Sequence, residues 1–309
     1  EMIISLALGL IIIAASIVVY TSSSRGGVIS QMETQLNEDG IVALNFIQQQ
    51  IKQAGYSTQV IPSNGATNMS NYRGVAVRGC DMGFSDSGVA FDNLTCESSG
   101  SAGAAIAIRY EATLDNTLPT SANLPSNCLG NGINSITPSD VSPPPKGGAA
   151  MYALADNRYM VDASGNQPML ICRGTEKNGS ANIIGTSQPL LANIEKMDIW
   201  YGVAKMPSAE LASVYDPLRH QIIGYKTAAE VESLANSGVF SSNNTLDRWG
   251  RVLSVRICLV VRSEQSVMDA PQGAHSYKDC KNIDVAATDG YLRRAFTTTV
   301  LLRNRLLIQ

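Results

Sequence analysis

The first twenty residues, EMIISLALGLIIIAASIVVY, place a single carboxylate in front of a long apolar run. No charged side chain occurs in the nineteen residues from Met2 to Tyr20. At 1.5 Å per residue they would form a helix about 28 Å long, close to the roughly 30 Å hydrocarbon core of a bilayer. The pattern therefore predicts one membrane-spanning helix. A cleaved secretory signal would have a shorter apolar core and a small-residue cleavage site, and the following TSSSRGG does not provide one.

The pattern changes after Gly26 and Gly27, where apolar residues begin to recur every three or four positions. The apolar positions of this stripe are Val28, Met32, Leu36, Ala43, Leu44, Ile47 and Ile51. Such spacing is typical of an amphipathic helix with one face on a core, and Gly55 is a suitable residue to end it. Each glycine weakens a helix by about 1 kcal/mol relative to alanine. We therefore expect local melting between residues 21 and 27, and Gly40 should weaken the helix further.

Residues 57–190 show a different pattern, rich in Ser, Asn, Gly and Pro with short apolar pieces between them. These pieces are YRGVAV, GAAIAIRY, GGAAMYAL, RYMV and PMLICR. Their length and the turn-forming residues around them predict short strands joined by long loops. Three consecutive prolines, Pro143 to Pro145, indicate an extended surface loop.

The final third is more regular. Thr227 and Glu230 fit a capping box, and Gly238 is a possible stop, so a short helix is expected between them. Two segments rich in β-branched residues show imperfect alternation, which predicts strands of a mostly antiparallel sheet. Their alternating positions are Val252, Val255, Ile257, Leu259 and Val261, followed by Phe296, Thr298 and Val300.

Composition limits the class of protein. The chain has 309 residues, of which 44% are hydrophobic and 16% charged, and its net charge is -3. These values indicate a folded body rather than a disordered or coiled-coil chain. Nucleic acid is a possible partner that the charge does not support. We interpret four arginines near the C-terminus as charges on solvated sheet faces and at element ends. They are Arg293, Arg294, Arg303 and Arg305.

Six cysteines occur, none in a CxxC pair and none near a histidine, which argues against a zinc site. They are Cys80, Cys96, Cys128, Cys172, Cys258 and Cys280. Six thiols permit 15 pairings. Short loops are the least costly to close, which favours Cys80 with Cys96 and Cys258 with Cys280, leaving Cys128 with Cys172. Buried free thiols in a cytosolic protein are the alternative.

Residues able to perform catalysis are scarce. His220 and His275 have no Ser or Cys signature beside them, and no G-x-S-x-G or Walker loop occurs. Three acids, Asp81, Asp86 and Asp92, lack the spacing of a calcium loop, and exposed turns explain them more simply. We therefore expect no enzymatic activity, no cofactor and no metal site.

Glu1 directly in front of an apolar helix resembles the mature N-terminus of type IV pilins and pseudopilins. In that family a leader and four mostly apolar residues precede the acid, whereas the printed sequence begins at Glu1. The resemblance implies that Glu1 pairs with the methylated N-terminal amine of a neighbouring subunit, which offsets the cost of a charge in lipid. It also implies lateral packing through one apolar stripe of the helix. Its residues are Ile3, Leu6, Leu10, Ile13 and Ile17.

Further motifs narrow the resemblance to PilW-type minor pilins. NEDGIVALNFIQQQIKQAGYS ends in an AGY turn at Ala54, Gly55 and Tyr56. The later stretches are similar to a W/Y-G-V strand, a V-R-I/V-x-L-L-V-R-S strand and a closing R-R-x-F-x-T-T-V-x-L-R-N-R. They stand here at Trp200 to Val203, Val255 to Ser263 and Arg293 to Arg305. Between the matching ends of the chain, residues 57–190 resemble this family only by their position.

The resemblance implies an α+β fold in which a long hydrophobic and then amphipathic N-terminal helix packs on a mostly antiparallel sheet with loop-rich, disulfide-tied insertions. We divide the chain into the helix, 1–55, and a β-rich head, 56–309. The implied function is a minor pilin that helps to prime type IV pilus assembly at or near the pilus tip. Its partners would be other minor pilins, the major pilin, the inner membrane and a prepilin peptidase.

The implied location is the bacterial inner membrane, with a periplasmic head, before assembly and the pilus at the cell surface afterwards. Twitching motility would follow from a role in pilus assembly. Two alternatives stay open. The head could be a tip adhesin or a module for DNA uptake, acting through the loops of residues 57–190. The chain could also be a J-type pseudopilin of type II secretion, although heads of that class are usually smaller.

Overall fold

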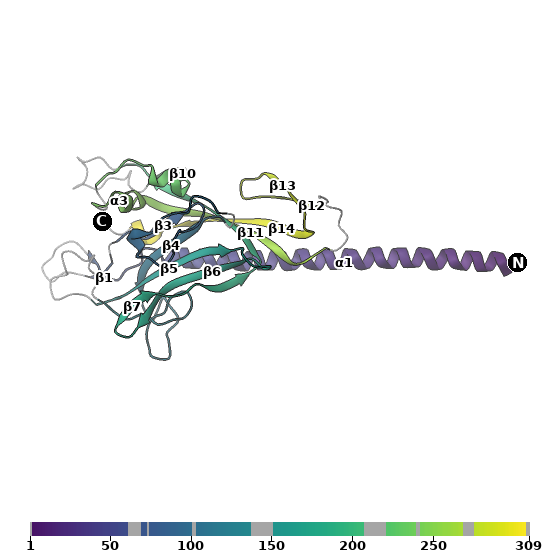
Figure 1. The fold of residues 1–309 in the computed structure, drawn as a ribbon, viewed down its shortest axis with the longest axis horizontal. Coiled ribbons are helices and arrows are strands. Elements are labelled where there is room, and N and C mark those ends of the chain that lie inside the picture. The colour runs from purple at the N-terminus through teal and green to yellow at the C-terminus, as the bar shows by residue number, and fades with distance from the viewer. Residues whose placement is uncertain are drawn as a thin grey trace.

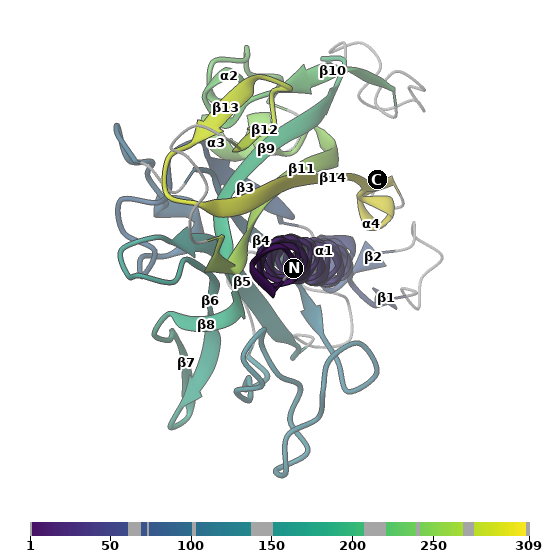
Figure 2. The same cartoon turned by 90° about the vertical axis from the view of Figure 1, so that its right-hand side faces the viewer.

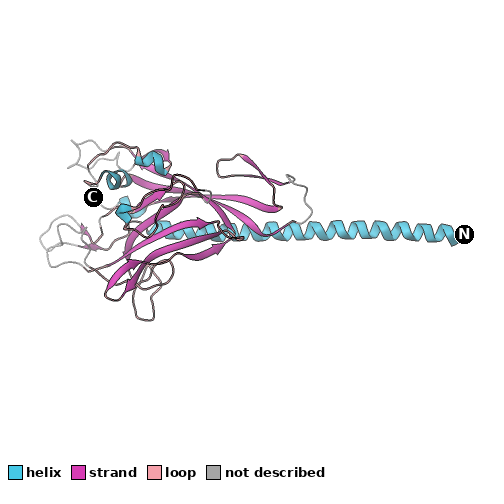
Figure 3. Ribbon diagram, viewed as in Figure 1, coloured by secondary structure: helices cyan, strands magenta, loops and turns pink. Residues whose placement is uncertain are grey.

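A computed structural model describes residues 2–60, 69–72, 74–100, 103–136, 151–206, 221–238, 242–267 and 275–306. One long helix, α1 (Met2–Gln53), projects from a head built mainly of strands (Figures 1 and 3). The described part of the head contains two larger antiparallel sheets and two two-stranded pairs, and the second half of α1 lies between the larger sheets (Figure 2). The fold is α+β, as predicted.

The helix is continuous through Gly26 and Gly27, so the expected break is absent. Helix formation is cooperative: nucleation costs free energy once, and each further residue adds a hydrogen bond. A cost of about 1 kcal/mol per glycine is too small to interrupt a helix that extends far on both sides. α1 ends at Gln53, and Gly55 follows with a left-handed φ of 76°. This conformation favours glycine and fits its expected role at the end of the helix.

The larger sheet has the order β3-β4-β5-β6-β7, and β8 also pairs with β6. Its strands are β3 (Val77–Cys80), β4 (Ala105–Ala112), β5 (Ala153–Asp162), β6 (Met169–Asn178), β7 (Ala181–Ile184) and β8 (Gln188–Ala192). Ala153 and Leu154, the end of the predicted piece GGAAMYAL, and the whole of the predicted piece RYMV belong to one strand, β5. A short pair, β1 (Gln59–Val60) with β2 (Met69–Ser70), and a 3-10 turn, η1 (Phe91–Asn93), lie outside this sheet.

The second sheet has the order β10-β9-β11-β14. Its strands are β9 (Ile194–Ala204), β10 (Ile222–Lys226), β11 (Val252–Ser266) and β14 (Tyr291–Leu301). The hairpin of β12 (His275–Lys278) and β13 (Asp284–Ala287) follows β11, and α4 (Arg303–Leu306) follows β14. The two sheets meet where Ala104 donates its N–H to the carbonyl of Met197, 2.6 Å away.

β11 explains why alternation in this segment is imperfect. From Val252 to Val261 every residue except Arg256 is buried, so both faces of the strand are covered. Odd-numbered residues such as Val255 and Ile257 belong to the core, while Cys258 on the other face bonds to Cys280 in the β12–β13 hairpin. A strand covered on both faces has no clean alternation of polar and apolar residues.

Three disulfides cross-link the head, in the pairs that loop length favoured. They join Cys80 to Cys96, Cys128 to Cys172 and Cys258 to Cys280. The prediction of disulfide bonds is confirmed. Their loops span 16, 44 and 22 residues, so each restricts a different part of the unfolded chain.

Two short helices cover one end of the second sheet: α2 (Ala228–Glu232) and α3 (Asn244–Trp249). Thr227 caps α2 with the predicted capping box, in which the Thr227 side chain and Glu230 each accept a backbone N–H of the other. The expected stop is wrong, because α2 ends before Ser233 rather than at Gly238. The Ser233 hydroxyl bonds to the Glu230 carbonyl at 2.8 Å and satisfies a free acceptor of the last turn.

Candidate functional site

We call residues 2–27 of α1 the projecting segment, because it extends beyond the head (Figure 1). By length and composition it can cross a membrane: its most apolar 18-residue window has a mean hydropathy of 2.9, and none of that window is buried. An apolar surface of this size is not stable in water and needs lipid or other apolar helices around it. The geometry is therefore compatible with membrane anchoring.

The proposed packing stripe lies in the projecting segment and is exposed, with relative accessibilities between 56% and 85%. Its members are Ile3, Leu6, Leu10, Ile13 and Ile17. Apolar residues on the other sides of the helix, such as Ile4, Ile11 and Val18, are as exposed. The structure does not distinguish one face of the projecting segment from the others, so the packing stripe stays a prediction. Glu1 lies outside the described residues.

Hydroxyl groups in the projecting segment bond within the helix. The Ser16 hydroxyl donates to the carbonyl of Ile12 at 2.8 Å, and the Thr21 hydroxyl donates to the carbonyl of Val18 at 3.0 Å. In hydrocarbon an unpaired hydroxyl would cost several kcal/mol, so internal bonding makes these side chains compatible with an apolar environment.

We call residues 28–53 the docked segment. Its buried residues follow the spacing of one helix face: Leu36, Gly40, Ala43, Ile47 and Ile51. They pack with the inner faces of β11 and β14, so this half of α1 belongs to the core of the head. A Cβ at Gly40 would overlap the ring of Phe296 in β14. Gly40 therefore permits close approach of helix and sheet, a role that its place in the 36–51 stripe could have indicated.

Polar contacts fix the rotation of the docked segment about its axis. On one flank Asn37 bonds to Arg294, and the Gln48 amide donates to the Thr298 hydroxyl at 3.4 Å. On another flank Gln50 accepts from the hydroxyl of the fully buried Tyr159 at 2.9 Å. Because both flanks are bonded, the projecting segment leaves the head in one direction.

Asp39 of the docked segment interacts with two other acids, Glu264 and Glu38. Partial burial, followed by the negative charges of Glu264 and Glu38, raises the pKa of its carboxyl above the ordinary value. Glu264 accepts a hydrogen bond from Gln35 at 3.4 Å. Asp39, Glu264 and Gln35 all line a cavity of about 270 Å³ between α1 and β11. Ionisation of Asp39 is therefore less favourable in the folded chain than in the unfolded chain.

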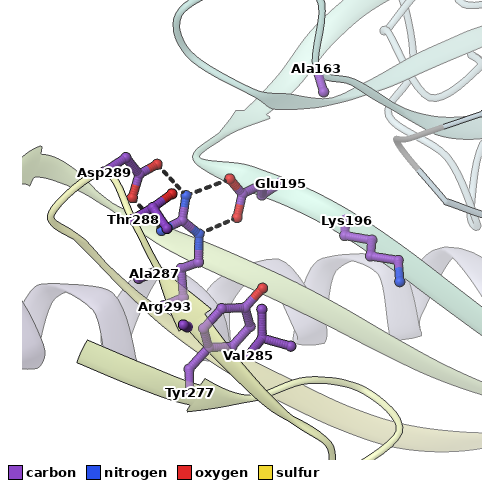
Figure 4. Close-up of a pocket in the computed structure, with 10 residues that line it drawn as sticks. Ala163, Glu195, Lys196, Tyr277, Val285, Ala287, Thr288, Asp289 and Arg293 are labelled. Atoms are coloured by element: carbon purple, nitrogen blue, oxygen red, sulfur yellow. Dashed lines mark hydrogen bonds and ion pairs between the residues drawn. The ribbon is translucent and has the colours of Figure 1, made fainter. Parts of the chain in front are cut away.

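Arg293 occupies the start of β14, beside the β12–β13 hairpin (Figure 4). Its guanidinium pairs with Glu195 of β9 at 2.5 Å and with Asp289 at 2.6 Å, and its side chain is only 8% exposed. The hydrogen bonds from Arg293 lower the pKa of Asp289 to about 2. Burial and the charge of Glu195 raise the pKa of Tyr277, which lines the same cavity of about 400 Å³.

Our interpretation of the four arginines as solvated charges is thus wrong for Arg293, whose position between two carboxylates only the tertiary structure reveals. It holds for Arg303, which is exposed in α4. Arg294 is exposed but bonds to α1. The Arg305 side chain lies outside the described residues.

The acids that we assigned to exposed turns differ from one another. Asp86 agrees with the expected exposed turn, because its carboxylate accepts the N–H of Gly88 there. Asp81 instead accepts the N–H groups of Ala228 and Ala229, which joins the end of β3 to α2. Asp92 lies 3.5 Å from Arg109.

Groups that could bind a metal are not found. Across the described residues no three His, Cys, Asp or Glu side chains are placed to hold one. Of the two histidines, His275 begins β12 opposite Ala287. His220 lies outside the described part of the chain, as do Pro143 to Pro145, for which we predicted a surface loop. The absence of enzymatic activity and of a cofactor stays a prediction.

Comparison with known proteins agrees with the PilW-type motifs. The sequence model of the family PilW, Type IV Pilus-assembly protein W, matches residues 158–304. The match includes β9, β11 and β14 and confirms the recognition of a PilW-type sequence in this part of the chain. It supports a pilus-related minor pilin that interacts with other pilins. The boundary between helix and head at residues 55 and 56 is not tested by this match.

No curated protein matches the sequence. Among solved structures, the Type IV-like pilin TTHA1219 from Thermus thermophilus aligns with a TM-score of 0.41 and 10% identity. The alignment covers 89% of this chain and 97% of that one.

Proposed function

We propose that this protein is a minor pilin that helps to prime type IV pilus assembly and takes a position at or near the pilus tip. Before assembly the projecting segment holds it in the bacterial inner membrane, with the head in the periplasm. A prepilin peptidase processes the chain, and the new N-terminal amine is methylated. The observation that supports this most is one rigid helix with an apolar half free of the head and a second half fixed to it.

Assembly replaces lipid around the projecting segment by the helices of other pilins. Lipid tails are as apolar as leucine, so association must come from close packing and from polar contacts rather than from the hydrophobic effect. The pairing of Glu1 with a neighbour's amine provides such a contact. It removes an uncompensated charge from hydrocarbon and makes entry into the filament favourable.

The substitution Glu1→Ala tests this role in the full-length precursor, produced in a cell that assembles pili. We expect the variant to remain in the membrane fraction, because the apolar run is unchanged, and to be depleted from sheared pili. Glu33→Ala is the control, since Glu33 is an exposed acid elsewhere on the same helix. Normal incorporation of the Glu1→Ala chain would show that the assigned role is wrong.

A further inference from the structure

Among the described strands, β14 forms the longest open edge of the head. The other outer strands are short or interrupted: β3 and β7 have four residues, β8 has five and contains Pro189, and β10 has five with an irregular register. Natural sheets shield their edges by such means, because an open edge is a template for another strand. β14 has 11 residues and pairs only with β11 among the described strands.

The direction of the β14 backbone groups follows from two bonds. Leu302 donates its N–H to the carbonyl of Leu253 at 2.8 Å, and Leu292 donates to the hydroxyl of Ser263 at 3.1 Å. Even-numbered residues between them therefore direct N–H and C=O groups toward β11, and odd-numbered residues direct theirs away. In the part of the chain that the structure describes, no group accepts the N–H of Ala295, Thr297 or Thr299.

This edge runs beside the docked segment of α1 (Figure 2). Asn37 and Gln48 of α1 contact Arg294 and Thr298 of β14, and Ile41 lies on the same helix flank, four residues after Asn37. Ile41 is 54% exposed, so the head leaves this apolar side chain of the docked segment largely uncovered. An added strand would therefore meet unpaired backbone groups on one side and an apolar side chain of α1 beneath it.

We propose that the outer edge of β14 pairs with an extended segment from the head of a neighbouring pilus subunit. The inference rests on the proposed function: a neighbour whose helix packs against α1 is already held nearby, which raises the effective concentration of its head. The edge sequence suits pairing, because Thr297, Thr298, Thr299 and Val300 are all β-branched. The outward side chains of Thr297 and Thr299 are exposed.

The double substitution Thr297→Pro with Thr299→Pro removes two N–H groups that point away from β11. Proline is tolerated where the N–H of an edge strand faces solvent, so the ladder to β11 should survive. The control is Thr297→Val with Thr299→Val, which keeps the N–H groups and the β-branched shape. Using the full chain in a pilus-forming cell, we expect the proline variant to fall about tenfold in sheared pili, equivalent to about 1.4 kcal/mol.

An unchanged amount of a folded proline variant in pili would overturn the proposal. Equal losses of the proline and valine variants would overturn it too, because side chains rather than N–H groups would then be responsible. Circular dichroism and thermal unfolding of the detergent-solubilised chains identify a folding defect.

Wild-type protein provides a test that does not depend on how the variants fold. Residue-resolved amide exchange is compared between the detergent-solubilised chain and the same chain in isolated pili. We expect Thr297 and Thr299 to exchange rapidly in the former and at least about a hundredfold more slowly in the latter. Phe296 and Thr298, which bond to β11, should be protected in both.

Rapid exchange at Thr297 and Thr299 within pili would refute strand pairing while leaving the minor-pilin role intact. Absence of the wild-type chain from pili would refute both. These two results distinguish failure of the further inference from failure of the proposed function.

Discussion

The two halves of α1 have different surroundings although they form one unbroken helix. The docked segment buries Leu36, Ala43, Ile47 and Ile51 against the head. The projecting segment is more apolar, yet its 18-residue window has nothing buried. Apolar character therefore does not show what covers a residue: the docked segment finds its partners in the same chain, and the projecting segment needs partners from outside.

The glycines of the helix show the same contrast. Gly26 and Gly27 have no atom near a Cβ position, whereas Gly40 lies under the ring of Phe296. Gly26 and Gly27 weaken the helix, and no contact among the described residues requires a glycine at either position. Gly40 is required for the close contact between helix and sheet. The same residue type therefore has different physical roles in the two halves of α1.

The largest expected difference between the halves is in core stability. Ile47→Ala should lower the free energy of unfolding of the head by about 2–5 kcal/mol, because Ile47 is fully buried and its truncation leaves a cavity. Ile13→Ala is the matched control, since Ile13 is 58% exposed. We expect it to leave head unfolding unchanged. Thermal unfolding of the detergent-solubilised chains measures both, and equal losses would contradict the division of α1.

A smaller difference is expected at the glycines. Gly40→Ala should destabilise the head by about 1–3 kcal/mol, because the new methyl group overlaps Phe296 and the overlap outweighs the gain of about 1 kcal/mol in helix propensity. Gly26→Ala gains the propensity without a clash and should increase helicity slightly. Circular dichroism with thermal unfolding compares them. Stabilisation by both substitutions would mean that helix and sheet are not in close contact at Gly40.

The smallest effect concerns the pH dependence of docking. Because the folded state raises the pKa of Asp39, it binds a proton more tightly than the unfolded chain does. The stabilisation is therefore complete below the ordinary pKa and is lost as pH rises through the raised value. Asp39→Asn should remove this part of the pH dependence and stabilise the head at neutral pH by less than about 1 kcal/mol.

The Asp39 measurement is the difference between wild-type and Asp39→Asn unfolding free energies over a pH series. Acids that do not interact with Asp39 cancel in that difference. Asp289 would otherwise contribute with the opposite sign, because its pKa is lowered to about 2 and its stabilisation is lost in acid. A difference that does not vary with pH would show that neither partial burial nor the charges of Glu264 and Glu38 raise the pKa of Asp39.

Several local features could be read from the sequence because they depend on neighbouring residues. The capping box of Thr227 and Glu230 and the left-handed Gly55 need only a few adjacent positions. The disulfide pairs agreed with loop length, since the shortest loops close at the least entropic cost. Local glycine content did not predict helix continuity, because cooperativity extends over many turns.

Noncovalent contacts between distant segments could not be predicted. Arg293 is 98 residues from Glu195, and no local pattern indicates that these charges meet or that the Arg293 side chain is only 8% exposed. No local pattern indicates that Phe296 is the residue that contacts Gly40, or that the edge of β14 is open. Each depends on the strand order β10-β9-β11-β14, which the sequence pattern left undetermined.

Periodicity and capping are properties of consecutive residues, so the amino-acid sequence alone predicts the long apolar and amphipathic helix, the strand-rich head and the PilW-type motifs. Which half of the helix packs against the head, and which backbone edge stays open, depends on the three-dimensional fold. Those outcomes depend on bringing residues up to about 250 positions apart into contact, and the free energy of such contacts comes from packing that no local pattern specifies.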